Sequence, residues 1–221
     1  MNLDRRETRM KTIVCYGDSN TWGAIPGQEG RYGRDERWPG VLRQELGAGY
    51  LIIEEGLGGR TTVWDDPIEG YKNGKEYLIP CLASHQPLDL VMIMLGTNDL
   101  KKRFSLTAFD IAHGAGVLVE IAQNSAAGPD GQAPKVLLLA PPPLAQLAGT
   151  EFADMFEDGE AKSKQLAYHY RRVAQELGCD LLDTAEVIVS SPLDGIHFEV
   201  AEHRKLGQAV AARVRKIFET A

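Results

Sequence analysis

Short apolar runs that end at chain-breaking residues constrain the fold more than any other feature of this sequence. They span residues 12–16, 51–55, 90–95 and 136–140, with a weaker run at 181–182. The first three are followed by glycine and the fourth by proline. Runs of this length, bounded in this way, are typical of strands that are buried on both faces in a parallel sheet.

Longer amphipathic stretches separate the apolar runs. They span residues 38–46, 76–85, 107–123, 160–177 and 201–218, the second of them interrupted by Pro80. In the last stretch Leu206, Val210 and Val214 recur every four residues, which places them on one face of a helix. Strands that alternate with helices predict an α/β protein, a doubly wound sandwich whose crossover helices cover both faces of a parallel sheet.

The length and composition indicate one globular domain. A chain of 221 residues fits one medium domain, and 43% hydrophobic with 25% charged residues is ordinary for a soluble protein. The formal net charge of -7 argues against binding to nucleic acid or to an anionic membrane, because both need a basic face. No stretch approaches the ~20 apolar residues that a membrane span requires.

The N-terminus and the cysteines bear on the cellular location. The first ten residues, MNLDRRETRM, are charged and lack the apolar core of a signal peptide. Cys15, Cys81 and Cys179 lie far apart and form neither a disulfide framework nor a metal-type spacing. We therefore expect a cytoplasmic protein in which residues 1–10 are loose and residues 11–221 form a single domain.

Polar residues and glycines follow the predicted strands. The segments are GDSNTWG at residues 17–23, GLGGRTT at 56–62, GTND at 96–99 and DGIHF at 194–198. In open α/β sheets the ligand site lies outside the carboxyl ends of the strands, so these segments should converge. Together they offer a hydroxyl, flexible backbone, an amide and an acid–imidazole pair, which are the parts of an acyl-transfer site.

The hydroxyl, the imidazole and the acid have distinct chemical roles. Ser19 is a weak nucleophile and needs a base within hydrogen-bond reach, which His197 can supply. Asp194, three residues before His197, can hold the imidazole N–H, fix its tautomer and stabilise the imidazolium. We predict these three residues as the catalytic set.

The oxyanion of a tetrahedral intermediate needs hydrogen-bond donors. The backbone N–H groups of Ser19 and Gly59 and the side-chain amide of Asn98 are the predicted donors, and each is typically worth ~10²–10³ in rate. Glycine in the second segment lets the backbone approach a substrate closely.

Each segment also has an ordinary structural interpretation. Asp18-Ser19 alone favours a helix N-cap, Gly58-Gly59 a turn, and Asn98-Asp99 a cap or turn. The remaining histidines fit a structural role, and Cys15 fits core packing; these histidines are His85, His113, His169 and His203. The acyl-transfer interpretation gains weight because four weak signals fall at four strand ends of one chain.

Two other classes of function are open. The chain could be a flavodoxin-like binding module in which residues 56–62 hold a phosphate, although the glycines match neither GxGxxG nor a Walker pattern. That interpretation leaves Asp194 and His197 unexplained. It could also be a metal-dependent hydrolase, but no His/Asp/Glu cluster has ligand spacing, so we expect no metal and no cofactor.

The four segments resemble the motifs of the SGNH (GDSL-type) hydrolases, a family named for Ser, Gly, Asn and His in four blocks. The blocks correspond here to Ser19, Gly59, Asn98 and His197, with Asp194 at the DxxH position. The similarity extends from about residue 11 to the C-terminus. The resemblance leaves two points open, whether Gly58 or Gly59 provides the oxyanion N–H, and what Asn20 does where the GDSL signature has leucine.

The stretches EEGLGGRTT, DDP and LDLVMIMLGTNDLK are similar to one subgroup, the bacterial arylesterase/acyltransferases. This similarity implies a flavodoxin-like three-layer α/β/α sandwich with a five-stranded parallel sheet. It also implies hydrolysis of small acyl esters through an acyl-enzyme, with acyl transfer to alcohols or peroxide, and a homo-oligomer, since some members form octamers. By the same resemblance Lys101, Phe152, Phe156 and Ile196 line the acyl entrance.

The stretch from residue 62 to residue 80 is long for a connection in a compact α/β domain. It contains Trp64, Tyr71, Tyr77 and Leu78 among charges and glycines. Aromatic residues on such a loop fit a subunit interface or a pocket wall as well as simple coverage of the core. With the subgroup similarity, we expect neighbouring subunits to help wall a narrow acyl channel.

We expect Ser19→Ala to fold normally and to lose ester hydrolysis by several orders of magnitude, because the nucleophile is gone. A serine-directed organophosphonate should label the wild type once, at Ser19, as measured by peptide mass spectrometry. Labelling at any other serine would overturn the assignment.

Overall fold

The computed structural model describes residues 9–219, and within that range five strands form one parallel sheet in the order β2-β1-β3-β4-β5. The strands are β1 (Lys11–Gly17), β2 (Tyr50–Gly56), β3 (Leu90–Met94), β4 (Lys135–Ala140) and β5 (Asp180–Asp183). All five apolar runs thus form strands; four are extended by one residue at one or both ends, and β3 ends one residue before the end of its run. Residues 1–8 of the segment expected to be loose lie outside the described range, as do residues 220–221.

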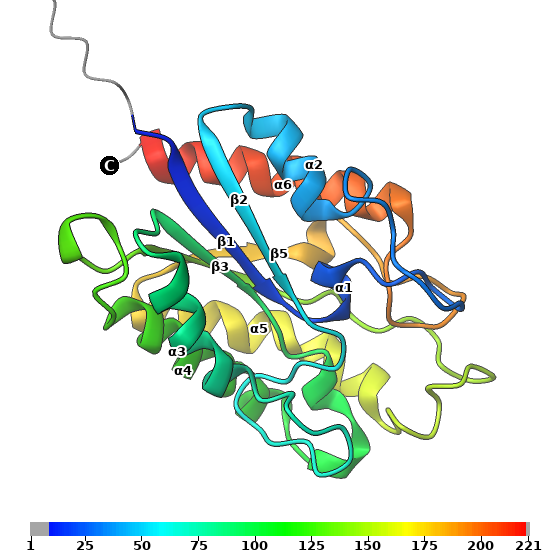
Figure 1. The fold of residues 1–221 in the computed structure, drawn as a ribbon. Coiled ribbons are helices and arrows are strands. Elements are labelled where there is room, and N and C mark those ends of the chain that lie inside the picture. The colour runs from blue at the N-terminus through cyan, green and yellow to red at the C-terminus, as the bar shows by residue number, and fades with distance from the viewer. Residues whose placement is uncertain (1–8, 220–221) are drawn as a thin grey trace, which may run out of the picture.

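Helices cover both faces of the sheet (Figure 1). They are α1 (Ser19–Trp22), α2 (Trp38–Leu46), α3 (Gly74–His85), α4 (Ala108–Gln123), α5 (Gly159–Leu177) and α6 (Val200–Glu219), with short 3-10 helices at Asn98–Leu100, Lys102–Phe104, Pro129–Gly131 and Thr184–Glu186. Helices α2 and α6 lie on one face, and α3, α4 and α5 lie on the other. The predicted flavodoxin-like three-layer sandwich is therefore confirmed, and its strand order is the flavodoxin order.

Two hydrophobic cores sandwich the sheet. Along β1, Val14 and Tyr16 face the core under α3, α4 and α5, whereas Ile13 and Cys15 face the core under α2 and α6. This alternation follows from the two-residue period of a strand. The predicted apolar stripe on α6 is fully buried in the second core. Cys15 is also fully buried there, as expected for a residue that packs in the core.

The connection before α3 is shorter than predicted. Helix α3 begins at Gly74, where the Asn73 side chain accepts from the backbone N–H of Lys75, and it continues through Pro80 to His85. The helical stretch expected at residues 76–85 is therefore confirmed and begins two residues earlier, whereas the long connection from residue 62 to residue 80 and the interruption at Pro80 are wrong. Burial of Leu78 and Cys81 on either side of the proline holds the helix together, because tertiary packing outweighs one missing hydrogen bond.

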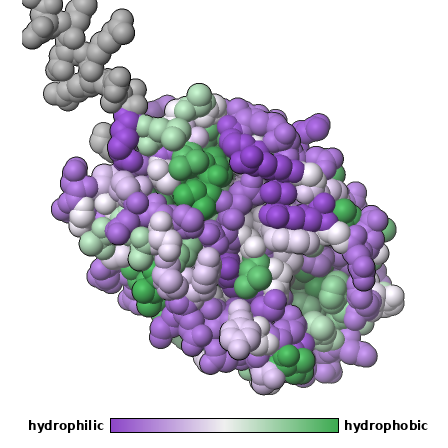
Figure 2. All heavy atoms as spheres, viewed as in Figure 1, coloured by the Kyte–Doolittle hydropathy of each residue, from purple (hydrophilic) through white to green (hydrophobic). Residues whose placement is uncertain are grey.

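The surface of the protein is mixed. On the face shown in Figure 2, hydrophobic residues form small groups separated by hydrophilic ones. Exposed large hydrophobic side chains include Ile68, Tyr71 and Ile79, from α3 and the segment before it. No helix within residues 9–219 has the length and apolar character that a membrane crossing demands.

The chain changes direction along the sheet at β1. It passes from β1 to β2 on one side and then to β3 on the other, so that Gly17 pairs with both Gly56 and Met94. A reversal of this kind leaves a crevice at the carboxyl ends of the strands, where α/β proteins bind ligands. The four predicted segments begin at these strand ends or lie just before α6.

Helices α2 and α6 approach so closely that Gly207 has no room for a side chain. A Cβ there would lie 2.6 Å from the Val41 Cβ and 2.9 Å from the Trp38 carbonyl oxygen. We expect Gly207→Ala to lower the free energy of unfolding by about 1–3 kcal/mol although alanine favours helices, because overpacking outweighs propensity. Thermal unfolding should show a Tm lower by about 2–12 °C.

The matched control is Gly49→Ala, where a Cβ would meet nothing within 4 Å. Its Tm should stay close to that of the wild type. An unchanged Tm for Gly207→Ala would mean that the two helices can separate without cost.

Candidate active site

Ser19 is the first residue of α1, and Asp18 alone separates it from the end of β1. The Asp18 side chain caps this helix, accepting from the backbone N–H of Asn20 at 2.9 Å. Burial raises the pKa of the Asp18 carboxyl to about 6. The cap interpretation of Asp18-Ser19 therefore holds, and the cap also places the Ser19 hydroxyl at the crevice.

The structure brings Ser19, His197 and Asp194 into one hydrogen-bonded chain. The His197 Nε2 lies 3.0 Å from the Ser19 Oγ, and the His197 Nδ1 lies 2.7 Å from the Asp194 Oδ2. These distances are within the range that proton transfer to a base requires. Ser19 and His197 are 178 positions apart in the sequence, and they meet here because both lie at the same edge of the sheet.

The Asp194 carboxylate is surrounded by donors. Its Oδ1 accepts from the backbone N–H groups of Ile196 and His197, each at 2.9 Å, and its Oδ2 also accepts from Gly27 N at 3.1 Å. Burial alone would raise the pKa of Asp194, but the hydrogen bonds from His197 and from the backbone lower it to about 2. Asp194 is thus held ionised, as a partner that stabilises an imidazolium must be.

The three predicted oxyanion donors border the same cavity as the serine. The Asn98 Nδ2 donates one hydrogen bond to the Arg60 carbonyl oxygen at 3.1 Å, which leaves its second N–H free to face the cavity. Gly59 has a φ of 80°, and a Cβ there would lie 2.6 Å from the Glu69 Oε2, so glycine is required. Gly59, and not Gly58, is among the residues that line the cavity.

Buried hydrogen bonds fix the segments relative to one another. The Asp99 carboxylate accepts from the Thr62 N–H at 3.0 Å and from the Thr62 hydroxyl, and so joins the third segment to the second. The Arg60 guanidinium donates to the Gly17 carbonyl oxygen at 2.8 Å and joins the second to the first. These links set the spacing between Asn98, Gly59 and Ser19.

Asn20 links the first segment to the fourth, which contains His197. Its side chain is 2% exposed, and its Nδ2 donates to the Ile196 carbonyl oxygen at 3.3 Å. The bond connects the helix of Ser19 to the loop of His197, which a leucine at this position could not do. The departure from the GDSL signature therefore has a structural role beside the triad.

A cavity of about 320 Å³ opens in front of Ser19 and His197. Its walls include all four residues assigned to the acyl entrance, and the full lining is Ser19, Gly59, Glu69, Asn98, Lys101, Phe152, Met155, Phe156, Ile196 and His197. The ring of Phe152 meets that of His197 edge-on, with centroids 5.9 Å apart. Phe152, Met155, Phe156 and Ile196 form an apolar side of the cavity, and the polar side chains gather around Ser19 and Lys101.

Lys101 contributes to the wall through ion pairs. Its Nζ lies 2.5 Å from the Glu69 Oε1 and 3.6 Å from the Asp66 Oδ2, and Asp66 also binds Arg103 at 2.9 Å. This network fastens the segment between β2 and α3 to the segment after β3. Sequence reasoning missed Glu69 and Met155, since neither stands next to a motif.

The other histidines lie outside this cavity. His203 is fully buried, and its Nδ1 accepts from the Trp38 N–H at 3.2 Å. Burial lowers the pKa of His203 to about 3, so it remains a neutral core residue. His85 differs from this pattern because it lies against Glu55 and near Cys81.

Comparison with known proteins agrees with the motifs described in the sequence. The profile of the GDSL-like lipase/acylhydrolase family matches residues 15–205. No curated protein matches the chain.

Among solved structures, the chain is similar to an aryl esterase from M. smegmatis, with 48% identity and a TM-score of 0.89 over 93% of this chain and 99% of that chain. It is also similar to a carbohydrate acetylesterase from Sinorhizobium meliloti, with 43% identity and a TM-score of 0.90 over 94% and 99%. A third match is a putative arylesterase from Agrobacterium tumefaciens, with 41% identity and a TM-score of 0.88 over 94% and 100%.

We expect Asp194→Asn to lower kcat on a small ester by about 10⁴-fold, because an amide N–H in place of Oδ2 would oppose the N–H of His197 and favour the wrong tautomer. Asp154→Asn, at an exposed carboxylate, is the matched control and should keep wild-type activity. Full activity in Asp194→Asn would show that another group orients the imidazole.

The same variant should change the acid stability. Since the folded-state pKa of Asp194 lies near 2, below its ordinary value of 3.8, its carboxylate stabilises the fold at any pH above about 4. That contribution disappears as the pH falls towards 2. The difference in unfolding free energy between wild type and Asp194→Asn, measured by denaturant titration, should therefore shrink across this window.

Proposed function

The chain belongs to the GDSL-like lipase/acylhydrolase family, as its motifs predicted, and from this membership we propose that it is a carboxylic ester hydrolase acting on small acyl esters through Ser19. The observation that carries the proposal is the hydrogen-bonded chain from Ser19 through His197 to Asp194, at 3.0 Å and 2.7 Å. It ends at a cavity that also contains Gly59 and Asn98.

In the first half of the reaction the Ser19 Oγ attacks the ester carbonyl while His197 Nε2 takes its proton. The negative charge that forms on the carbonyl oxygen is bound by the Ser19 and Gly59 N–H groups and the Asn98 amide. His197 then returns the proton to the leaving oxygen, the C–O bond breaks, and an acyl-enzyme remains on Ser19. Asp194 stabilises the imidazolium in between.

In the second half an acceptor displaces the acyl group. Water gives the carboxylic acid, an alcohol gives a new ester, and peroxide gives a peracid; His197 removes the acceptor's proton in each case and returns it to Ser19. The largely apolar wall of Phe152, Phe156 and Ile196 favours an acceptor that can compete with water. Acyl transfer is part of our proposal for this reason.

The size of the cavity favours a short acyl group. Its volume of about 320 Å³ is near the lower end of ligand pockets, and the rings of Phe152 and Phe156 are part of its wall. The similarity to an aryl esterase and to a carbohydrate acetylesterase supports acetyl esters of aromatic alcohols or sugars as candidate substrates.

We also propose that the chain assembles into a homo-oligomer, with an octamer as one arrangement that its subgroup suggests. The side chains of Ile68 and Tyr71 are 73% and 101% exposed, on the segment that contributes Glu69 to the cavity. Coverage of this segment by a neighbouring subunit would bury them and extend the cavity wall. Sedimentation should then give a multiple of 24.2 kDa.

We expect kcat/KM on aryl esters to fall by at least about tenfold from the acetyl to the octanoyl ester, because the walls exclude longer chains. Adding a small alcohol should divert acyl groups into a new ester, which chromatography of the products measures. Dialysis against a strong chelator should leave the hydrolytic rate unchanged, because the proposed steps use only side chains and backbone.

Ser19→Ala is the control in each assay and should give no product above background. Equal rates on acetyl and octanoyl esters would refute the short-chain proposal but leave the triad intact. Loss of the rate on dialysis, restored by a divalent ion while the Tm stays unchanged, would refute the mechanism itself.

A further inference from the structure

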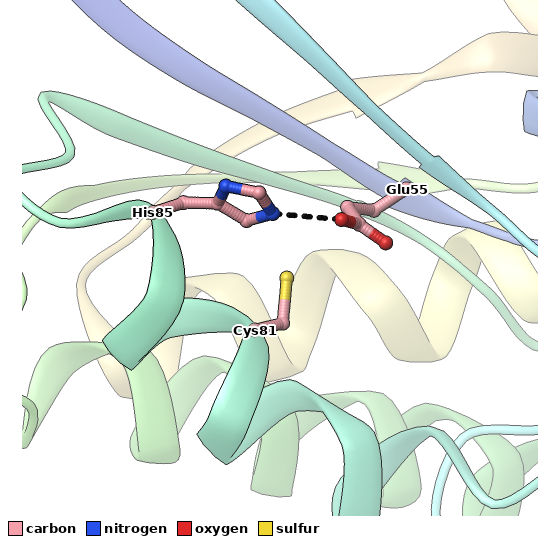
Figure 3. Close-up of side chains that lie close together, drawn as sticks. All are labelled: Glu55, Cys81 and His85. Carbon is pink, nitrogen blue, oxygen red and sulfur yellow. Dashed lines mark hydrogen bonds and ion pairs between the residues drawn. The ribbon is translucent and has the colours of Figure 1, made fainter.

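Three side chains with metal-binding chemistry meet away from the crevice. Glu55 is on β2, and Cys81 and His85 are four residues apart on α3 (Figure 3). The His85 Nε2 lies 2.8 Å from the Glu55 Oε1, and the donor atoms of all three residues lie within 4.8 Å of one another. The Cys81 Sγ points towards the Glu55–His85 pair.

The spacing matches what a small cation needs. Residues four apart on a helix project from the same face, as the two histidines of helical zinc motifs do. Zinc binds sulfur at about 2.3 Å and nitrogen or oxygen at about 2.0–2.2 Å, so tetrahedral ligand atoms lie roughly 3.3–3.8 Å apart. The present donor atoms all lie within 4.8 Å of one another, close to that spacing.

We propose that Glu55, Cys81 and His85 bind one Zn²⁺ ion, with a water molecule in the fourth position. A thiolate, an imidazole and a carboxylate are together the donor set that Zn²⁺ prefers, whereas Mg²⁺ and Ca²⁺ prefer oxygen ligands throughout. Two anionic ligands also balance the charge of the ion.

The ion has a path to this position. A cavity of about 480 Å³ borders Glu55 and is walled by Tyr77, Pro80 and Arg60, among others. The side chains of Glu55 and His85 are 18% and 29% exposed, so both are reached from solvent. Solvent that reaches these two side chains can supply the fourth ligand.

Binding exchanges protons for the ion. Burial and the charge of Glu55 raise the pKa of the Cys81 thiol to about 12, while Arg60 opposes this, so the metal-free thiol is protonated. Zn²⁺ displaces the thiol proton to solvent and forms a Zn–S bond. In the metal-free protein the His85 Nε2–H donates to the Glu55 carboxylate. On binding, His85 takes the tautomer with its proton on Nδ1, so that Nε2 binds the ion and the hydrogen bond to Glu55 is replaced by two bonds to the ion.

The ion would fasten α3 to an outer strand of the sheet. Strand β2 has a hydrogen-bonded neighbour on one side, β1, and it leads directly into the turn of Gly58 and Gly59. A bond through the metal joins this strand to the helix at a second point. We therefore assign the ion a stabilising role that is separate from the chemistry at Ser19.

Titration with Co²⁺ as a spectroscopic substitute for Zn²⁺ tests the site, in a phosphine reductant that does not bind the metal. The wild type should show a thiolate-to-Co²⁺ charge-transfer band that saturates at one ion per chain. Cys81→Ser should abolish the band, and His85→Ala and Glu55→Gln should each weaken Zn²⁺ binding by more than about 100-fold in calorimetry. Saturating Zn²⁺, at 100 times its Kd, should raise the Tm by about 5–10 °C.

Matched controls separate this site from the other cysteines and histidines and from the proposed esterase function. Cys179→Ser and His113→Ala remove a thiol and an imidazole elsewhere and should bind Co²⁺ as the wild type does. Ser19→Ala should also bind normally, whatever its activity. The proposal is overturned if the wild type shows no thiolate band, or if the band survives Cys81→Ser and is lost in Cys179→Ser.

Discussion

The position of β1 between β2 and β3 is the constraint on which the rest of the structure depends. Because the chain builds its next two strands on opposite sides of β1, the loops that leave β1 and β3 separate and expose a crevice. The packing around Gly17, at the end of β1, is tight: a Cβ there would lie 2.0 Å from the Thr21 Oγ1 and 3.0 Å from the Met94 carbonyl oxygen. A larger residue would push α1, and Ser19 with it, away from the sheet.

Much of the fold and site could be predicted because both depend on local signals. A buried parallel strand must be apolar along its whole length, so its limits can be recognised in sequence, and the residue after its last apolar position is fixed at the sheet edge. Ser19 follows β1 in this way and Asn98 follows β3. Asp194 and His197 were recognisable because a carboxylate orients an imidazole three residues away through a short turn.

The features that could not be predicted depend on contacts between residues that are distant in the sequence. The continuity of α3 was not predicted because Pro80 opposes a helix locally, while burial of Leu78 and Cys81 favours it. Glu69 reaches the cavity through its ion pair with Lys101, which no local pattern encodes. Cys81 and His85 do have helical ligand spacing, but their third partner, Glu55, lies on a strand and is identified only once the two elements pack together.

The outer position of β2 has a consequence for how copies of the protein behave when crowded. An outer strand presents unpaired backbone groups that can pair with the strand of another molecule and start aggregation. Here Glu54 binds Arg37 at 2.5 Å and Arg43 at 3.2 Å, so that charged side chains lie beside the outer strand. On the opposite border β5 spans four residues, and Arg213 lies 3.4 Å from Asp180. The charged side chains beside β2 and the short length of β5 make pairing between the sheets of two molecules unfavourable.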